Sequence, residues 1–354
     1  MRPNHPKLID VRAQAPEYLY QQGALKKFAG DFFRGKLDDL DRLLNVFDSA
    51  GIDNRPLAVP IEWFAEEKSF QEKNDTYIER ALELSSAAIN TLLEKNDLEP
   101  GNIDHLLFVS TTGLATPSLD ARLIGKLGMR PDTRRTPIWG LGCAGGALGL
   151  TQAYDILIGK PEALALLVNV ELCSLTFQFR DFSKGNLVAT ALFSDGVTAA
   201  LLVGANSTLA GPQIIAAGER LWPDTLDIMG WNVSNEGMQV VFSQRIPQIV
   251  REKMKDCLSD FLAANGLTLE KINRFLIHPG GRRVIEAYCE ALDLPPRSLA
   301  LSCEVLRKYG NCSSASVMIV LEEFLRRGDS QQGDLALVSA LGPGFSAGSA
   351  LLRM

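Results

Sequence analysis

The sequence predicts an α/β protein composed of two similar halves. Short apolar runs, expected to form buried strands, alternate with longer amphipathic stretches, expected to form helices, along the 354 residues. The second half also repeats the first. The segment 103–110 (IDHLLFVS) matches 272–279 (INRFLIHP) at a shift of 169 residues, and the same shift places 142–147 (GCAGGA) on 311–316 (NCSSAS).

Each expected element follows from one of two patterns. Apolar residues at helical spacing predict helices at 24–49, 76–95, 118–128, 144–158, 244–265, 282–292 and 313–327. Short apolar runs predict strands at 105–111, 164–170, 196–204, 273–278, 334–341 and 347–353. We assign residues 1–208 to the first half and 209–354 to the second. The alternative to a duplication is a chance likeness between strand–helix units.

The composition of the chain argues against several classes of function. A chain that is 46% hydrophobic and 22% charged suits a globular protein with a large core. No apolar run approaches the roughly 20 residues that span a bilayer, and the polar start lacks a signal-peptide stretch. Six irregularly spaced cysteines predict reduced thiols and a cytoplasmic location. The formal net charge of −6 argues against nucleic-acid binding, so an anionic substrate would need a local basic patch such as Arg134–Arg135 or Arg282–Arg283.

Cys143 is the first candidate for chemistry. It lies in the segment 139–146 (WGLGCAGG), where an apolar strand is expected to turn sharply into a helix. A helix N-terminus and a nearby imidazolium both favour the thiolate over the thiol, whose ordinary pKa is about 8.5. The sequence therefore predicts a nucleophilic thiolate, and the alternative is a buried structural cysteine beside a glycine-rich turn.

His278 is the strongest of three histidines. His5 lies near the terminus, and His105 opens a strand after polar residues, so both are expected to be structural. His278 ends an apolar strand and precedes Pro-Gly-Gly, which places it where a strand meets a loop. If the repeat is real, His278, Cys143 and Asn311 come together where the two halves meet, a usual place for a site.

Asn311 has two interpretations. It lies in Gly-Asn-Cys-Ser-Ser-Ala-Ser at the start of an expected helix, where it could act as an N-cap. It could instead donate an amide hydrogen bond to a developing oxyanion. Metal-ligand spacing, a Walker loop and the dinucleotide fingerprint Gly-x-Gly-x-x-Gly are all missing from the sequence, so we expect no metal and no cofactor.

Together these segments resemble the type III polyketide synthases, the chalcone-synthase-like group with a thiolase fold. The resemblance runs from about residue 45 to the C-terminus and also includes the terminal segment 341–348 (LGPGFSAG). It implies a Cys143–His278–Asn311 triad, a layered αβαβα fold made of two duplicated halves, and a homodimer. The substrates it implies are malonyl-CoA and an acyl-CoA starter, which a decarboxylative condensation joins.

The resemblance also assigns residues around the cavity. Phe193 matches the phenylalanine between the CoA tunnel and the reaction chamber, and the second such phenylalanine of plant members falls on Val240. Thr116 matches a loop position that reaches the partner subunit's cavity, and Thr176 matches a cavity-wall residue that tunes cyclisation. Arg55 and the pair Arg282–Arg283 are the candidates for the CoA phosphates.

The wall residues suggest the starter. Small or thiol-bearing side chains at Thr112, Thr116 and Cys173, with Val240, resemble those of bacterial alkylpyrone and alkylresorcinol synthases. We therefore expect a hydrophobic tunnel past Cys173 that takes a long fatty acyl chain. The rivals are an initiating ketoacyl carrier-protein synthase, a catalytically silent thiolase-fold scaffold that binds a partner, and a cysteine hydrolase.

Overall fold

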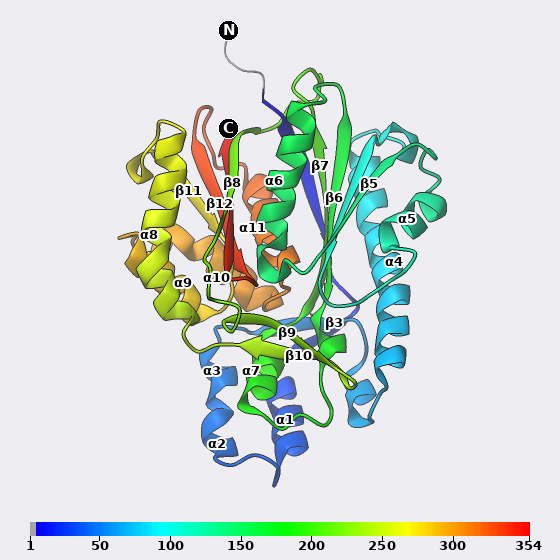
Figure 1. Cartoon of the computed structure of the whole chain (residues 1–354), viewed down its shortest axis with the longest axis vertical. Helices are drawn as coiled ribbons and strands as arrows, with labels where there is room; N and C mark the ends of the chain where they lie inside the picture. The colour runs from blue at the N-terminus through cyan, green and yellow to red at the C-terminus, as the bar shows by residue number, and fades with distance from the viewer. Residues whose placement is uncertain (1–4) are drawn as a thin grey trace.

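The computed structural model describes residues 5–354 as layers of helices and strands (Figure 1). The strands are β1 Lys7–Gln14, β2 Tyr18–Gln21, β3 Asn54–Leu57, β4 His105–Ser110, β5 Arg134–Trp139, β6 Leu164–Leu172, β7 Asp195–Val203, β8 Gln213–Leu221, β9 Met229–Ser234, β10 Gly237–Phe242, β11 Arg274–Ile277, β12 Leu335–Gly342 and β13 Ser346–Arg353. The α-helices are α1 Gln22–Phe33, α2 Leu40–Leu43, α3 Asn45–Ser49, α4 Phe70–Lys95, α5 Leu119–Leu127, α6 Gly145–Ile158, α7 Lys184–Leu192, α8 Ile246–Ala264, α9 Arg282–Ala291, α10 Ala300–Tyr309 and α11 Ser314–Arg327.

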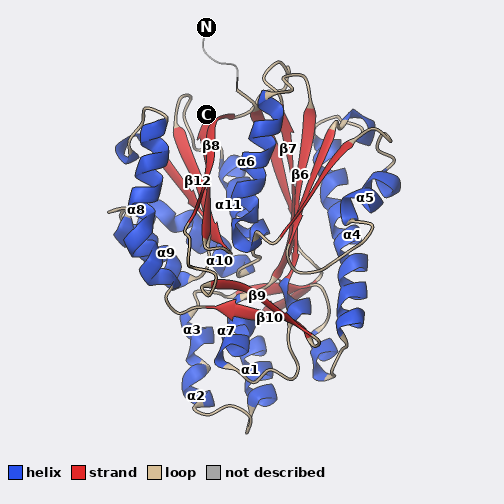
Figure 2. Cartoon of the chain, in the orientation of Figure 1, coloured by secondary structure: helices blue, strands red, loops and turns tan. Residues whose placement is uncertain are grey.

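Nine strands form a mixed sheet in the order β11-β12-β13-β8-β1-β7-β6-β4-β5. Strands β1 and β8 are paired at a single position, Lys7 with Gln213, so the sheet divides there into two parts. Helices α6 and α11 lie between the two parts, and further helices cover the outer faces (Figures 1 and 2). This is the αβαβα arrangement of a thiolase fold, as predicted.

Three apolar cores hold the layers together. Because side chains alternate across a strand, β4 sends Leu106 and Phe108 to the core under α4, and Leu107 and Val109 to the core around α6 and α11. The third core joins α8 and α9 to the outer face of β8, β11, β12 and β13. Strands buried on both faces explain the continuous apolar runs that predicted them. Among the residues in the structure, no helix is both long and apolar enough to cross a bilayer.

The duplication is visible in the elements themselves. Helices α6 and α11 each have 14 residues, and their bounds differ by the shift of 169 residues found in the sequence. Strands β4 and β11 begin at His105 and Arg274, which the same shift relates. The exact boundary between 208 and 209 stays a prediction; it falls in the connection from β7 to β8. Residues 1–4 of the first half lie outside the described residues.

One predicted helix was wrong, and several elements were missed. The stretch 24–49 is divided into α1, α2 and α3. Gly35 and Asp39 adopt positive φ angles of 69° and 56° between α1 and α2, and Leu44 separates α2 from α3. Helix α4 begins six residues earlier than predicted, at a capping box between Ser69 and Glu72. The missed strands include β5, an edge strand with a largely exposed surface and little apolar alternation.

Candidate active site

Cys143 lies at the junction of the two halves. It occupies a short 3₁₀ turn, Gly142–Ala144, directly before α6, and its side chain is buried. Gly142 has a φ of +48°, and a Cβ atom there would lie 2.6 Å from Cδ of Pro343. Glycine is therefore required for the turn that presents Cys143. A strand, β5, does precede the turn, but it is largely exposed, unlike the apolar strand that the sequence predicts there.

Asn311 lies beside this thiol, at the corresponding place in the second half. Its Oδ1 atom is 4.0 Å from Sγ of Cys143 and accepts a 2.8 Å hydrogen bond from the Ser313 backbone N–H. Its Nδ2 atom donates to the carbonyl of Gly280 at 3.2 Å. Helix α11 is capped by Ser313, so Asn311 is not its N-cap residue. One N–H of the amide is left for another acceptor.

His278 is brought to the same place through Gly280. It follows β11, and its backbone N–H donates to the Ser339 carbonyl at 2.9 Å, which fixes the end of the strand. A Cβ atom on Gly280 would lie 3.5 Å from Nε2 of His278, so the imidazole packs against the residue that Asn311 binds. The imidazole is buried, and within residues 5–354 neither ring nitrogen has a hydrogen-bond partner.

The electrostatics of the site differ from the prediction. Burial raises the pKa of Cys143 to about 12, against hydrogen bonds from Ser313 and Asn311 that lower it, and the nearby Glu171 raises it further. Burial alone lowers the pKa of His278 to about 3. Burial therefore favours a thiol and a neutral imidazole over the thiolate predicted from the helix N-terminus. Desolvation exceeds the stabilisation that the first turn of a helix provides.

Sequence reasoning missed Glu171, a fully buried carboxyl group near the thiol. It accepts hydrogen bonds from the Thr111 backbone N–H at 3.1 Å and the Ser314 hydroxyl at 2.7 Å. Burial raises its pKa to about 7. A single acidic residue inside the largely apolar strand β6 was the signal available in the sequence.

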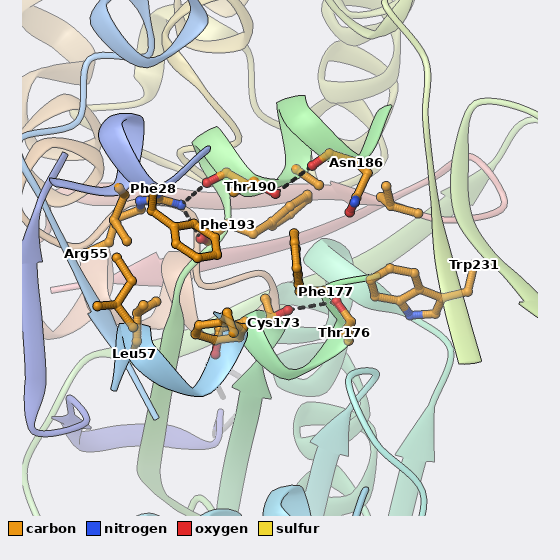
Figure 3. A pocket seen from close by; sticks show the side chains of 16 residues that line it. Phe28, Arg55, Leu57, Cys173, Thr176, Phe177, Asn186, Thr190, Phe193 and Trp231 are labelled. Atoms are coloured by element: carbon orange, nitrogen blue, oxygen red, sulfur yellow. Dashed lines mark hydrogen bonds between the residues drawn. The ribbon is translucent and has the colours of Figure 1, made fainter. Parts of the chain in front are cut away.

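A cavity, here called the cysteine cavity, adjoins Cys143. A second and larger cavity, the distal cavity, adjoins the first (Figure 3). The two share four wall residues: Cys173, Phe193, Trp231 and Val240. The distal cavity is lined mainly by apolar side chains.

Five of the predicted wall residues line one cavity or both. They are Thr112, Cys173, Thr176, Phe193 and Val240. The match of Val240 to the second phenylalanine stays a prediction. A second phenylalanine does lie nearby: Phe242, two residues further along β10, packs edge-on against Phe193 with 5.8 Å between ring centroids, and it lines the cysteine cavity.

Thr116 and the pair Arg282–Arg283 lie elsewhere, whereas Arg55 lines the distal cavity. Thr116 is exposed on the loop after β4 and lines neither cavity of its own chain. Arg282 and Arg283 are exposed at the start of α9, where Arg282 forms an ion pair with Glu286 at 2.9 Å. Arg55 is buried instead of lying at a tunnel mouth.

The buried guanidinium of Arg55 is held by backbone carbonyls. Its Nη1 donates to the carbonyls of Thr190 at 2.6 Å and Phe193 at 2.8 Å. Burial lowers its pKa to about 9, and the buried carboxylate of Asp195 opposes that shift. Arg55 therefore positions the backbone at Phe193, and its expected contact with CoA phosphate has no support in this geometry.

The protein has a thiolase fold made of two halves. A cysteine, an imidazole and a carboxamide are buried where the halves meet. Residues 61–207 match the family model for chalcone and stilbene synthases, N-terminal domain. Residues 262–354 match the model for the C-terminal part of 3-oxoacyl-[acyl-carrier-protein] synthase III.

Known proteins are similar to this chain over nearly its whole length. A Bacillus subtilis (strain 168) protein, whose name assigns it provisionally to the chalcone synthases, is 40% identical over 96% of both chains. A 1,3,6,8-tetrahydroxynaphthalene synthase of Streptomyces peucetius subsp. caesius is 40% identical over 97% of this chain and 92% of its own. The crystal structure of the 1,3,6,8-tetrahydroxynaphthalene synthase of Streptomyces coelicolor A3(2), a bacterial type III polyketide synthase, superposes with a TM-score of 0.93 at 29% identity, covering 98% of this chain and 99% of that one.

The chain therefore belongs to the chalcone and stilbene synthase family and is a type III polyketide synthase, a condensing acyltransferase.

Proposed function

We propose that the enzyme extends a long-chain fatty acyl-CoA starter with malonyl-CoA and cyclises the product to an alkylpyrone or alkylresorcinol. The single observation that carries this proposal is that the two cavities adjoin. The cavity lined by Cys143 shares the wall residues Cys173 and Val240 with a larger apolar cavity, and we propose that the acyl chain passes between them there. We further propose that CoA thioesters are the only substrates and that no cofactor or metal takes part.

The first half-reaction loads the starter. Sγ of Cys143 attacks the acyl carbonyl while His278 accepts the thiol proton, a role for which the imidazole must start in the neutral form that burial favours. The carbon–sulfur bond to CoA breaks, and the departing CoA thiolate takes the proton from His278. The acyl group is left as a thioester on Cys143, and His278 is again neutral.

The second half-reaction extends the chain. Malonyl-CoA loses CO₂, and the electron pair of the broken bond becomes an enolate on the thioester oxygen. An N–H of His278 and the free N–H of Asn311 donate to that oxygen and stabilise the developing charge. The enolate carbon attacks the acyl group, Cys143 leaves, and a chain two carbons longer remains on CoA.

Substitution of the triad tests these roles. Cys143→Ala is expected to abolish condensation but to retain malonyl-CoA decarboxylation, because the enolate is stabilised by other residues. His278→Ala is expected to slow both reactions by about 100–1000-fold. Product formation and CO₂ release are measured separately, with Cys289→Ala, outside both cavities, as the control. Polyketide made by Cys143→Ala would refute the assignment.

The distal cavity supports a long alkyl starter. Each methylene group buried there would contribute about 0.8 kcal/mol, so kcat/KM is expected to rise with acyl length. Cys173→Phe places a ring between the two cavities and is expected to shift the preference to short starters. The measurement is kcat/KM over an acyl-CoA length series, with Cys303→Phe at an exposed position as the control. A preference unchanged by Cys173→Phe would count against this path.

A second candidate product follows from the comparisons, since a 40% identical relative is named a 1,3,6,8-tetrahydroxynaphthalene synthase. Mass spectrometry distinguishes the two. Alkylpyrones and alkylresorcinols carry the alkyl chain of the acyl-CoA starter, whereas 1,3,6,8-tetrahydroxynaphthalene has no alkyl chain, so the product masses differ. The apolar lining of the distal cavity favours the alkyl product.

We also propose a homodimer, a cytoplasmic location and a basic CoA entrance. Arg282 and Arg283 remain the candidates for the CoA phosphates, because both are exposed on the element that follows His278. The cytoplasmic location agrees with six cysteines that are all free thiols. Thr116 is exposed and accessible to a partner subunit.

A further inference from the structure

Helix α1 supplies part of the wall of the distal cavity through Leu25 and Phe28. Phe28 packs edge-on against two other wall residues, Phe64 at 6.3 Å and Phe177 at 6.2 Å between ring centroids. Three aromatic rings from separate segments thus close this part of the cavity. Phe64 is buried, whereas Phe28 and Phe177 are both partly exposed. Phe28 lies on the surface helix α1, so its ring separates the cavity from solvent there.

Phe28 lies away from the entrance to the distal cavity. The four residues that the distal cavity shares with the cysteine cavity include Cys173 and Trp231. They form the side of the distal cavity that is nearest to the cysteine cavity. Phe28 lines only the distal cavity, and Figure 3 shows it with Leu57 on the side opposite Trp231. An acyl chain that enters past Cys173 therefore extends toward Phe28.

We propose that Phe28 sets the maximum length of the acyl chain that the enzyme accepts. This inference rests on the proposed function, because it assumes that the distal cavity holds the starter's alkyl chain. Each methylene buried before the chain reaches Phe28 increases kcat/KM by about 4-fold. A chain that reaches the ring must displace it or fold back, so kcat/KM stops rising at that length. We call this length the break point.

The experiment measures kcat/KM for saturated acyl-CoAs from hexanoyl to eicosanoyl with three variants. Phe28→Ala opens the wall and is expected to move the break point to chains longer by about two carbons or more. Phe28→Trp enlarges the ring and is expected to move it to shorter chains. The two substitutions change volume in opposite directions, so a general loss of stability cannot produce both results.

Phe32→Ala is the matched control. Phe32 lies one turn further along α1 and contacts the same aromatic group, at 6.0 Å from Phe28 and 5.0 Å from Phe177, but it does not line the cavity. It is expected to leave the break point unchanged. Circular dichroism and urea unfolding establish that each variant is folded.

Two results would overturn the inference while leaving the proposed function intact. One is a break point that is the same in wild type, Phe28→Ala and Phe28→Trp. The other is an equal shift in Phe32→Ala, which would attribute the effect to the placement of α1 instead of the Phe28 side chain. If the wild type uses no alkyl starter of any length, the proposed function itself fails, and the role of Phe28 fails with it.

Discussion

Ionisable side chains that are fully or nearly buried gather around Cys143. Burial raises the pKa of Glu171 to about 7 and that of Asp195 to about 6, and it lowers the pKa of His278 to about 3. In every case burial shifts the pKa in the direction that favours the uncharged form. Because burial favours a neutral thiol and a neutral imidazole, a proton can pass from Cys143 to His278 as the substrate is attacked, and this is the order of events proposed above.

Glu171 gives the stability a pH dependence. Its pKa rises from an ordinary 4.5 to about 7 on folding, so the folded protein holds this proton more tightly than the unfolded chain. Stability from this group is fully present below about pH 4.5 and is lost as the pH rises to about 7, by up to about 3 kcal/mol. The amide introduced by Glu171→Gln cannot titrate, so this variant is expected to lack this loss of stability.

Urea unfolding between about pH 4.5 and 8 tests this expectation. The difference between wild type and Glu171→Gln should change over that range, because Asp195 titrates in both proteins and cancels. Glu162→Gln, at an exposed carboxyl group, is the control. A difference that stays constant with pH would contradict the assignment.

Side-chain types predicted part of the site correctly. The segments around Cys143, His278 and Asn311 pointed to three groups that the fold does bring together. The interpretation of individual side chains was wrong at positions where burial determines their role. Arg55 looked like a phosphate ligand because it is a cation, but it is buried on backbone carbonyls. Glu171 was missed because it lies in a mainly apolar strand, and the groups that hydrogen-bond to its carboxyl come from distant segments of the chain.

At the scale of elements, helices α6 and α11 pack very closely at their first turns. A Cβ atom on Gly146 would lie 2.4 Å from the Ser314 carbonyl oxygen and 2.5 Å from Cγ1 of Val317. This contact holds Cys143 and Asn311, the residues just before the two helices, at their short separation. Glycine is therefore required at position 146 by the approach of the two halves.

Gly146→Ala is expected to destabilise the fold by about 1–3 kcal/mol, because backbone atoms must shift to admit the methyl group. Gly125→Ala is the control. Gly125 lies in the exposed helix α5 with nothing within 4 Å of an added Cβ, so this substitution is expected to stabilise by up to about 1 kcal/mol. Urea midpoints at constant m-value measure both. Equal effects of the two substitutions would show that the helix contact does not limit position 146.

Periodicity predicted the long elements well and the short ones poorly. Strands and helices that are buried on both sides, such as β6 and α6, were placed to within two residues. The stretch 24–49 looked like one amphipathic helix, but positive φ angles at Gly35 and Asp39 divide it. Apolar spacing continues across such a break, so periodicity cannot detect it.

At the scale of the whole molecule, an exposed apolar surface lies at the edge strand β5. Trp139 is 51% exposed and Leu114 is 43% exposed, and the Trp139 indole N–H donates to the Gly113 carbonyl at 3.2 Å. Thr116 is exposed on the same loop. Contiguous exposed apolar side chains at a sheet edge are typical of an interface.

Trp139→Arg is therefore expected to weaken the proposed homodimer. Loss of a central tryptophan costs about 2–4 kcal/mol of binding free energy, which corresponds to a dissociation constant roughly 30–1000-fold higher. Light scattering over a protein concentration series measures this. Leu226→Arg, at a side chain that is 81% exposed elsewhere, is the control. A monomeric wild type, or equal effects of the two variants, would exclude this surface.

The sequence by itself determined the class of fold, the repeat of 169 residues and the chemical identity of the three central side chains, because apolar periodicity and glycine-rich turns are local properties. Only the tertiary structure decided the protonation of Cys143 and His278, the burial of Arg55 and Glu171, the place of Phe242 and the two joined cavities. Desolvation and cavity shape depend on atoms contributed by segments far apart in the chain. The spacing of residues along one segment therefore cannot predict desolvation or cavity shape.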